Sequence, residues 1–292
     1  MEKERSIKDL APCFKRGAML SVKSFLILSV LILLPVTISA DTILLTSDTW
    51  CPYNCAVDAK LPGYTIEVSK RIFEKAGHTL KYEIAPWSRS LKLVKEGHIT
   101  AIVGVTRNEA PDLIFPEQEF GISVIHFFKR KNFTWNFTGT QSLKSIRIGI
   151  MADYEYGSEL DEYFEKNRNT IKVQMIKAEK PLVLNIRKLL KKRIDVIPED
   201  KSVFMNASHS MGVSDKIEDA GIDPVTSKEG LDESKLYMAF SPKNPKSEEY
   251  AKLISDGIEQ MRLSGELSQI LAKYNLMDWR EDFKDVIEKY QK

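Results

Sequence analysis

Hydrophobic and polar positions alternate with two different periods along the first third of the chain after residue 41. Short apolar or alternating runs predict strands, and apolar positions three and four residues apart predict helices. The run ITAIVGV is apolar throughout, which is typical of a strand covered on both faces. The predicted order is strand 42–47, helix 64–77, strand 80–86, helix 87–97 and strand 99–105. This order is the signature of an α/β sheet.

The same alternation restarts after a polar, aperiodic segment at 131–145. Before this segment we predict a strand at 122–130. After it we predict strands 146–151, 171–178, 194–200 and 235–242, and helices 158–167 and 181–193. Residues 247–276 predict one or two amphipathic helices, with a break near Gly265. A charged helical tail follows. The second unit therefore repeats the architecture of the first without repeating its sequence.

The N-terminal segment has the layout of a secretory signal peptide. Lys23 precedes an unbroken apolar run from Phe25 to Val36, and small or polar residues lead from there to Ala40. The run is shorter than the roughly 20 residues of a membrane-spanning helix. We expect residues 1–40 to be removed and the mature, periplasmic chain to begin at Asp41. An uncleaved N-terminal anchor is the alternative.

Charge adds little once this segment is set aside. The whole chain carries 43 basic and 41 acidic residues, and residues 41–292 retain 37 and 38 of them. A near-neutral body has no electrostatic reason to bind nucleic acid. Hydrophobic residues make up 43% and charged residues 29% of the chain, which is ordinary for a folded globular protein.

Two cysteines lie close together in the loop TSDTWCPYNC. In an exported chain Cys51 and Cys55 meet an oxidising compartment, where disulfides persist. The redox motif has two residues between its cysteines, whereas this loop has three. The four histidines are scattered, without the spacing of metal ligands. A structural disulfide, free thiols and a metal or redox site remain open on the spacing alone.

Four stretches together resemble one family over residues 42–276, the extracellular solute-binding proteins of family 3. These are periplasmic type II binding proteins that serve amino-acid ABC transporters. The motif PWSR is similar to that of a divergent subgroup. The resemblance lies in the order and spacing of PGYTIEVSKRIFEKAG, APWSRSLKLVKEGHITAIVGVTRNEAPDLIFPEQEF, SIRIGIMADYEYGSEL and RKLLKKRIDVIPED.

The resemblance implies an α/β fold with two lobes, a hinge and a ligand cleft between the lobes. We expect lobe 1 to comprise residues 41–130 and 237–276, lobe 2 to comprise residues 131–236, and the tail to comprise residues 277–292. It further implies a monomer that binds a small molecule and meets a membrane permease or receptor, with no cofactor and no metal.

The family holds the α-groups of an amino acid with an arginine and an acid. Asp200 matches the acid that binds the ammonium group, although a helix N-cap is the simpler role. Glu109 stands where the family has its arginine. Arg107, two residues earlier in the same loop, and Arg89 in PWSR are the candidates to replace it.

Several aromatic residues fall on predicted cleft loops and favour stacking on a flat or cationic ligand. The loop WCPYNC is interpreted as the lip of the pocket, held by a Cys51–Cys55 disulfide. The expected ligand-binding residues are Trp50, Tyr53, Asn54, Trp87, Arg89, Thr106, Arg107, Tyr154, Tyr156, Ser158 and Asp200.

The leading function is therefore a binding protein and not an enzyme. The sequence contains no Gly-x-Ser-x-Gly, His-Glu-x-x-His or phosphate-loop motif. A ligand-sensing partner of a membrane receptor is the main alternative. A dehydratase-like enzyme on the same fold and a thiol oxidoreductase are further alternatives.

Overall fold

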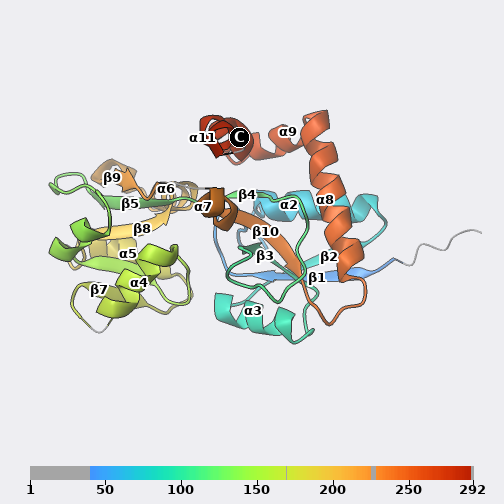
Figure 1. Ribbon diagram of the computed structural model, residues 1–292, viewed down its shortest axis with the longest axis horizontal. Coiled ribbons are helices and arrows are strands. Elements are labelled where there is room, and N and C mark those ends of the chain that lie inside the picture. Colours follow the sequence, from blue (N-terminus) through green and yellow to red (C-terminus); the bar gives the residue numbers. More distant parts are fainter. Residues whose placement is uncertain (1–39, 169, 225–227, 291–292) are drawn as a thin grey trace, which may run out of the picture. The chain divides into compact units, whose positions relative to one another are not determined.

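The computed structural model describes residues 40–168, 170–224 and 228–290 (Figure 1). The expected signal peptide lies outside these residues, except for Ala40 at its end. Within the described ranges, no helix has both the length and the hydrophobicity needed to cross a membrane.

The first sheet has five strands among the described residues, in the order β2-β1-β3-β10-β4. Its strands are β1 (Thr42–Ser47), β2 (Thr79–Ile84), β3 (Ala101–Val105), β4 (Gly121–Ile122) and β10 (Lys235–Phe240). β1 pairs in parallel with β2 and β3, and the crossovers are α2 (Tyr64–Lys75) and α3 (Trp87–Lys95). The strands and helices predicted over 42–105 are thus confirmed.

Apolar side chains cover both faces of this sheet. Ile43, Val103 and Phe240 pack with α2 and with the C-terminal helices α8 (Ser247–Ser264) and α9 (Glu266–Ala272). Ile102 packs on the opposite face, against α3. In Figure 1, α2 and α8 lie on one side of the sheet and α3 on the other. The predicted helix break is confirmed at Gly265, whose φ of 78° suits glycine.

The second sheet also has five described strands, in the order β7-β6-β8-β5-β9. They are β5 (Ile125–Arg130), β6 (Ile148–Met151), β7 (Val173–Ile176), β8 (Val196–Asp200) and β9 (Ile217–Ile222). The accompanying helices are η2 (Thr140–Ser145), α4 (Ser158–Asn167), α5 (Pro181–Leu190), α6 (Lys201–Ser210) and η3 (Ser214–Lys216). Helix α7 (Lys228–Glu233) lies in the connection after β9, and its Leu231 packs with Ile122 and Trp279. The strand at the centre, β8, is buried at every position.

Strand β5 departs from the expected division of the chain. We expected lobe 1 to reach residue 130, but β5 pairs with β8 and β9 in the second sheet. Its side chains explain this placement. Phe127 stacks on Phe137 at 4.0 Å between ring centroids, and Phe128 stacks on Phe204 at 3.7 Å. The chain therefore leaves the first sheet between β4 and β5, and returns to it between β9 and β10.

Helix α6 and strand β9 were not predicted, and neither were the short helices η2, η3 and α7. The apolar pattern of α6 is weak, and its start depends on a side chain: Asp200 accepts a hydrogen bond of 3.1 Å from the Val203 amide. The tail contains the short helices α10 (Trp279–Asp282) and α11 (Lys284–Tyr290).

Candidate ligand-binding site

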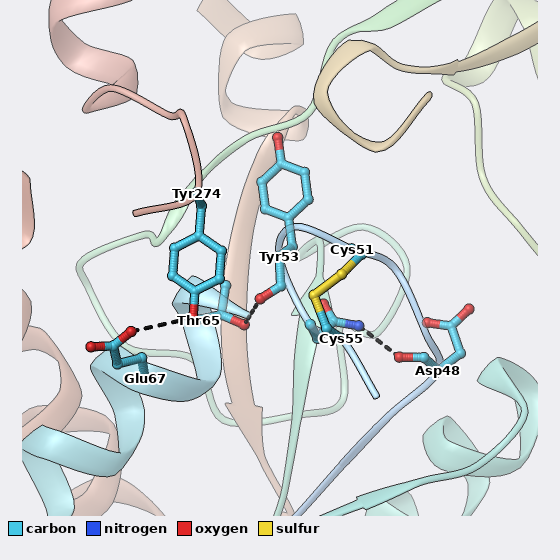
Figure 2. Close-up of a disulfide and its surroundings, with 8 residues drawn as sticks. Asp48, Cys51, Tyr53, Cys55, Thr65, Glu67 and Tyr274 are labelled. Carbon is cyan, nitrogen blue, oxygen red and sulfur yellow. Dashed lines mark hydrogen bonds between the residues drawn. A yellow bond between two sulfur atoms is a disulfide. The ribbon is translucent and has the colours of Figure 1, made fainter. Parts of the chain in front are cut away.

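The loop after β1 is held against the start of α2. A Cys51–Cys55 disulfide closes it (Figure 2), which confirms the predicted bridge. The Thr65 hydroxyl donates a hydrogen bond of 2.8 Å to the Tyr53 carbonyl. Gly63 allows the close approach, because a Cβ there would lie 2.3 Å from that carbonyl oxygen. The loop is thus presented in a fixed geometry.

Three aromatic side chains make hydrogen bonds between the two sheet units. The Trp50 indole N–H donates to Glu199 Oε1 at 3.2 Å, and the Tyr53 hydroxyl donates to Asp200 Oδ2 at 3.1 Å. In the opposite direction, the Tyr154 hydroxyl donates to Asp48. Tyr154 also packs against apolar residues of both units. These bonds hold loops of both units around one cavity.

The cavity between these loops has a volume of about 90 Å³. The first unit contributes Asp48, Trp50, Asn54, Trp87, Thr106 and Glu109. The second unit contributes Tyr154, Glu155, Tyr156 and Glu199. Of the eleven predicted ligand-binding residues, six line it: Trp50, Asn54, Trp87, Thr106, Tyr154 and Tyr156.

The carboxyl groups of the cavity have raised pKa values because they are removed from water. Burial raises the pKa of Glu199 to about 8 and that of Glu109 to about 8. Burial also raises the pKa of Asp48 to about 6, against an opposing hydrogen bond from Tyr154. The Trp87 indole N–H donates to Glu109 in a similar way. The protein therefore compensates the negative charge of these three carboxyl groups poorly.

Two buried acceptor atoms that belong to residues lining the cavity have no hydrogen-bond partner. One is Oδ1 of Asn54, a residue with 1% of its surface exposed, and the other is Oε2 of Glu199, which is 3% exposed. Their neighbouring atoms are occupied: the Asn54 amide donates to Ser47 and to the Asp48 carbonyl, and Glu199 Oε1 accepts from the Asp200 amide. Buried acceptors without partners are unfavourable, so the site suits a ligand that donates hydrogen bonds.

The two candidate arginines lie elsewhere. The Arg107 guanidinium stacks over the rings of Phe115 and Tyr237, at 5.0 and 4.7 Å from their centroids, and donates to the Pro116 carbonyl at 2.7 Å. Arg89 is exposed on α3. Neither lines the cavity. Arg107 is directed away because aromatic faces and a carbonyl bind it on its own side of the loop.

Two other predicted residues, Asp200 and Tyr53, also lie outside the cavity lining. Both oxygens of Asp200 are engaged, one by Val203 and the other by Tyr53 and Ser123. Tyr53 is buried with its hydroxyl on Asp200. Ser158 begins α4, and its side chain lies outside the part of the chain that the structure describes.

Sequence reasoning missed Asp48, Glu155 and Glu199 as cavity residues. Glu199 precedes Asp200 in β8, where every residue is buried, so the alternation that would reveal its direction is hidden. Glu155 stands between Tyr154 and Tyr156, and Asp48 is two residues before Trp50, and these aromatic residues were predicted. Carboxylates next to aromatic residues on two facing loops were the available signal.

A larger hollow of about 570 Å³ lies between α6 and residues 271–283. Asp200 and His126 lie on its wall, but Asp200 is fully bonded and His126 Nδ1 is 2.7 Å from Asp219. The two unpartnered acceptors lie instead on residues of the smaller cavity. We therefore place the site in the smaller cavity.

The model of bacterial extracellular solute-binding proteins, family 3, matches residues 43–277. The chain belongs to this family. The resemblance of the sequence to family 3 is thereby confirmed, and its members bind solutes outside the cytoplasm. No curated protein matches the chain.

Solved structures of two-lobed binding proteins share the fold of this family 3 chain. One is from a study of glutathione import through GshT and the cystine ABC importer TcyBC of Streptococcus mutans, with a TM-score of 0.67, 16% identity, and coverage of 83% of this chain and 99% of that one. An ancestral arginine-binding protein bound to arginine has a TM-score of 0.63, 16% identity, and coverage of 81% and 99%. A histidine kinase sensor domain has a TM-score of 0.63, 16% identity, and coverage of 81% and 95%.

Replacing Cys51 and Cys55 with serine should weaken ligand binding without unfolding the protein. The bridge closes a loop of about five residues, for which chain entropy gives roughly 2 kcal/mol of stability. The loop carries Trp50 and Asn54, so its loss of order falls directly on the cavity. Urea unfolding and titration calorimetry of the double variant measure the two effects separately. Unchanged affinity would contradict the role of the bridge in presenting the loop.

Proposed function

We propose that this family 3 protein captures a small polar solute between its two lobes in the periplasm and delivers it to an ABC-transporter permease. The main support is the cavity itself. Its wall comes from both sheet units, and Trp50–Glu199, Tyr53–Asp200 and Tyr154–Asp48 hydrogen bonds join the units around it. A solute enclosed in this way is shielded from water and contacts both units.

Opening requires these bonds, the Tyr154 contacts and the packing of Val203 and Leu182 against the core of the first sheet unit to separate. The chain passes between the sheets at two places, residues 123–124 and 223–234. Hinge motion at such connections is the usual mechanism of closure around a ligand. Because the same bonds form only on closure, solute and closure stabilise each other.

Presentation of the solute to a membrane sensor is the second candidate function. Its support is the structural likeness to a histidine kinase sensor domain, which extends over 81% of this chain. Both functions use the same cavity and differ only in the protein that receives the closed form.

A thermal-shift screen tests capture of a solute. The purified protein is refolded to remove bound solute and mixed with amino acids, amines, small carboxylates and cyclic compounds. A solute that binds only the folded state at 100 times its Kd adds about 2.7 kcal/mol to stability, which raises the melting temperature. A rise with any of these supports the proposal. If no compound of the four classes raises it, the proposed function is wrong.

A further inference from the structure

We propose, resting on the function above, that the solute is a small organic cation, either an amine or a guanidine, and that it carries no carboxylate group. The cavity binds it through the carboxyl groups of Glu199, Glu109 and Asp48 and through the side-chain amide oxygen of Asn54, with aromatic rings on the remaining wall.

The charge of the wall is one-sided. Four carboxyl groups line the cavity, those of Asp48, Glu109, Glu155 and Glu199. Among the described residues that line it there is no lysine, arginine or histidine. A solute carboxylate would lie among acids with no positive partner, which is strongly unfavourable away from water. A solute cation would supply the missing positive charge.

The free hydrogen-bonding atoms point to the same chemistry. The unpartnered atoms Asn54 Oδ1 and Glu199 Oε2 can both accept. The indole N–H groups of Trp50 and Trp87 are already used, because they donate to Glu199 and Glu109. An ammonium group offers three donors and a guanidinium group five, and neither accepts. Such a group would supply the donor that each acceptor lacks.

The aromatic wall and the small volume of the cavity narrow the class of solute further. Trp50, Trp87, Tyr154 and Tyr156 line the cavity, and cations are attracted to aromatic faces. One water needs roughly 10–15 Å³, so a cavity of about 90 Å³ takes only a small solute. Among the described residues, no group of three His, Cys, Asp or Glu side chains is placed to hold a metal ion, which favours an organic cation.

The position of the arginines excludes the usual arrangement for an α-amino acid. A bidentate arginine is the natural partner of a solute carboxylate. Glu109 stands in the cavity where that arginine is expected, and Arg107 is bound to Phe115, Tyr237 and Pro116. Several acids can bind the ammonium end of a solute, whereas no basic side chain among the described lining residues can bind its carboxylate end.

Matched pairs of ligands that differ only by one carboxylate test this directly. Titration calorimetry compares ethylamine with alanine, ethanolamine with serine, putrescine with ornithine, and agmatine with arginine. We expect at least one amine to bind at least tenfold more tightly than its parent amino acid. An amino acid that binds more tightly than its amine in every pair that binds would overturn the cation proposal, while the capture function would stand. Binding by neither member of any pair would also overturn it, and the broader screen then decides the capture function.

Two variants and the pH test the assigned groups. Glu109→Gln and Glu199→Gln remove one negative charge each with little change of shape, and each should weaken amine binding at least tenfold at pH 8.5. Glu83→Gln, on an exposed glutamate of β2, is the matched control and should not change it. On the unmodified protein, amine affinity should rise between pH 6 and 8.5, with proton release seen as a dependence of binding enthalpy on the buffer. Affinity that is flat or falls over this range would overturn the assignment, even if a variant failed to fold.

Discussion

Raising the pH from 5.5 to 8.5 should lower the unfolding free energy of the ligand-free protein by about 4 kcal/mol, or roughly 10 °C in melting temperature. The effect comes mainly from Glu109 and Glu199, with a smaller contribution from Asp48, whose pKa burial raises to about 6. Burial raises the pKa of each to about 8 in the folded protein, whereas the unfolded chain has an ordinary glutamate value of 4.5. The figure is smaller than the sum of roughly 6 kcal/mol for two independent groups, because the two glutamates share one cavity and ionisation of one opposes that of the other.

The sign follows from counting protons. Between pH 4.5 and 8 the folded protein holds protons on these glutamates that the unfolded chain has lost. Stability therefore falls as the pH rises and these protons leave. Asp195 acts in the opposite direction, but only under more acidic conditions: burial opposes ionisation, yet hydrogen bonds from Arg147 and Arg130 lower its pKa. Its contribution is lost below the range of this experiment.

Urea unfolding at four pH values between 5.5 and 8.5 measures the slope. The double variant Glu109→Gln and Glu199→Gln should flatten it, because glutamine resembles the protonated acid and does not titrate. Glu83→Gln should leave the slope of the parent protein unchanged. A parent protein whose stability is constant or rises over this range would contradict the raised pKa values. A saturating amine should oppose the fall, since its charge compensates the ionised glutamates.

The fold was predictable because its signals are local. The parallel strands of the first sheet are short apolar runs, and the helices between them carry clear 3.6-residue patterns ending near glycine. Strand β5 was also found, but its sheet was not. Which sheet it joins depends on the stacking of Phe127 and Phe128 on distant rings, and no local pattern carries that information.

The site was predictable only in part, for a related reason. Loops at strand ends predicted Trp50, Trp87 and Tyr154, which line the cavity, because the position of a loop follows from the topology. The direction of a charged side chain depends on its partners. Arg107 matched the need for a cation, but two aromatic rings bind it elsewhere. Asp200 matched the family acid, yet it caps α6 and its neighbour Glu199 lines the cavity.

Replacing Glu119 with alanine should destabilise the protein by about 3–5 kcal/mol and release the tail helices α10 and α11. Glu119 is 4% exposed and lies between β3 and β4. Its Oε1 accepts hydrogen bonds from the Trp279 indole at 3.0 Å and from Arg280 Nη2 at 2.8 Å, and lies 3.7 Å from Arg262. The substitution leaves two guanidinium groups and an indole N–H without this acceptor in a largely buried place.

The release should be local as well as global, because α10 is a single turn that depends on these contacts. Hydrogen exchange in residues 279–287 should rise far more than in α8, which contacts Glu119 through Arg262 but is held by buried apolar residues of the core. Glu117→Ala is the matched control, since this glutamate has an exposed side chain two residues away. It should change the unfolding free energy by no more than about 0.5 kcal/mol and leave the exchange of residues 279–287 unchanged. If Glu119→Ala unfolded at the same urea concentration as the parent protein, the buried carboxylate would not be what fixes the tail. Since Trp279 and Phe283 also line the larger hollow, the same variant shows whether that hollow depends on a docked tail.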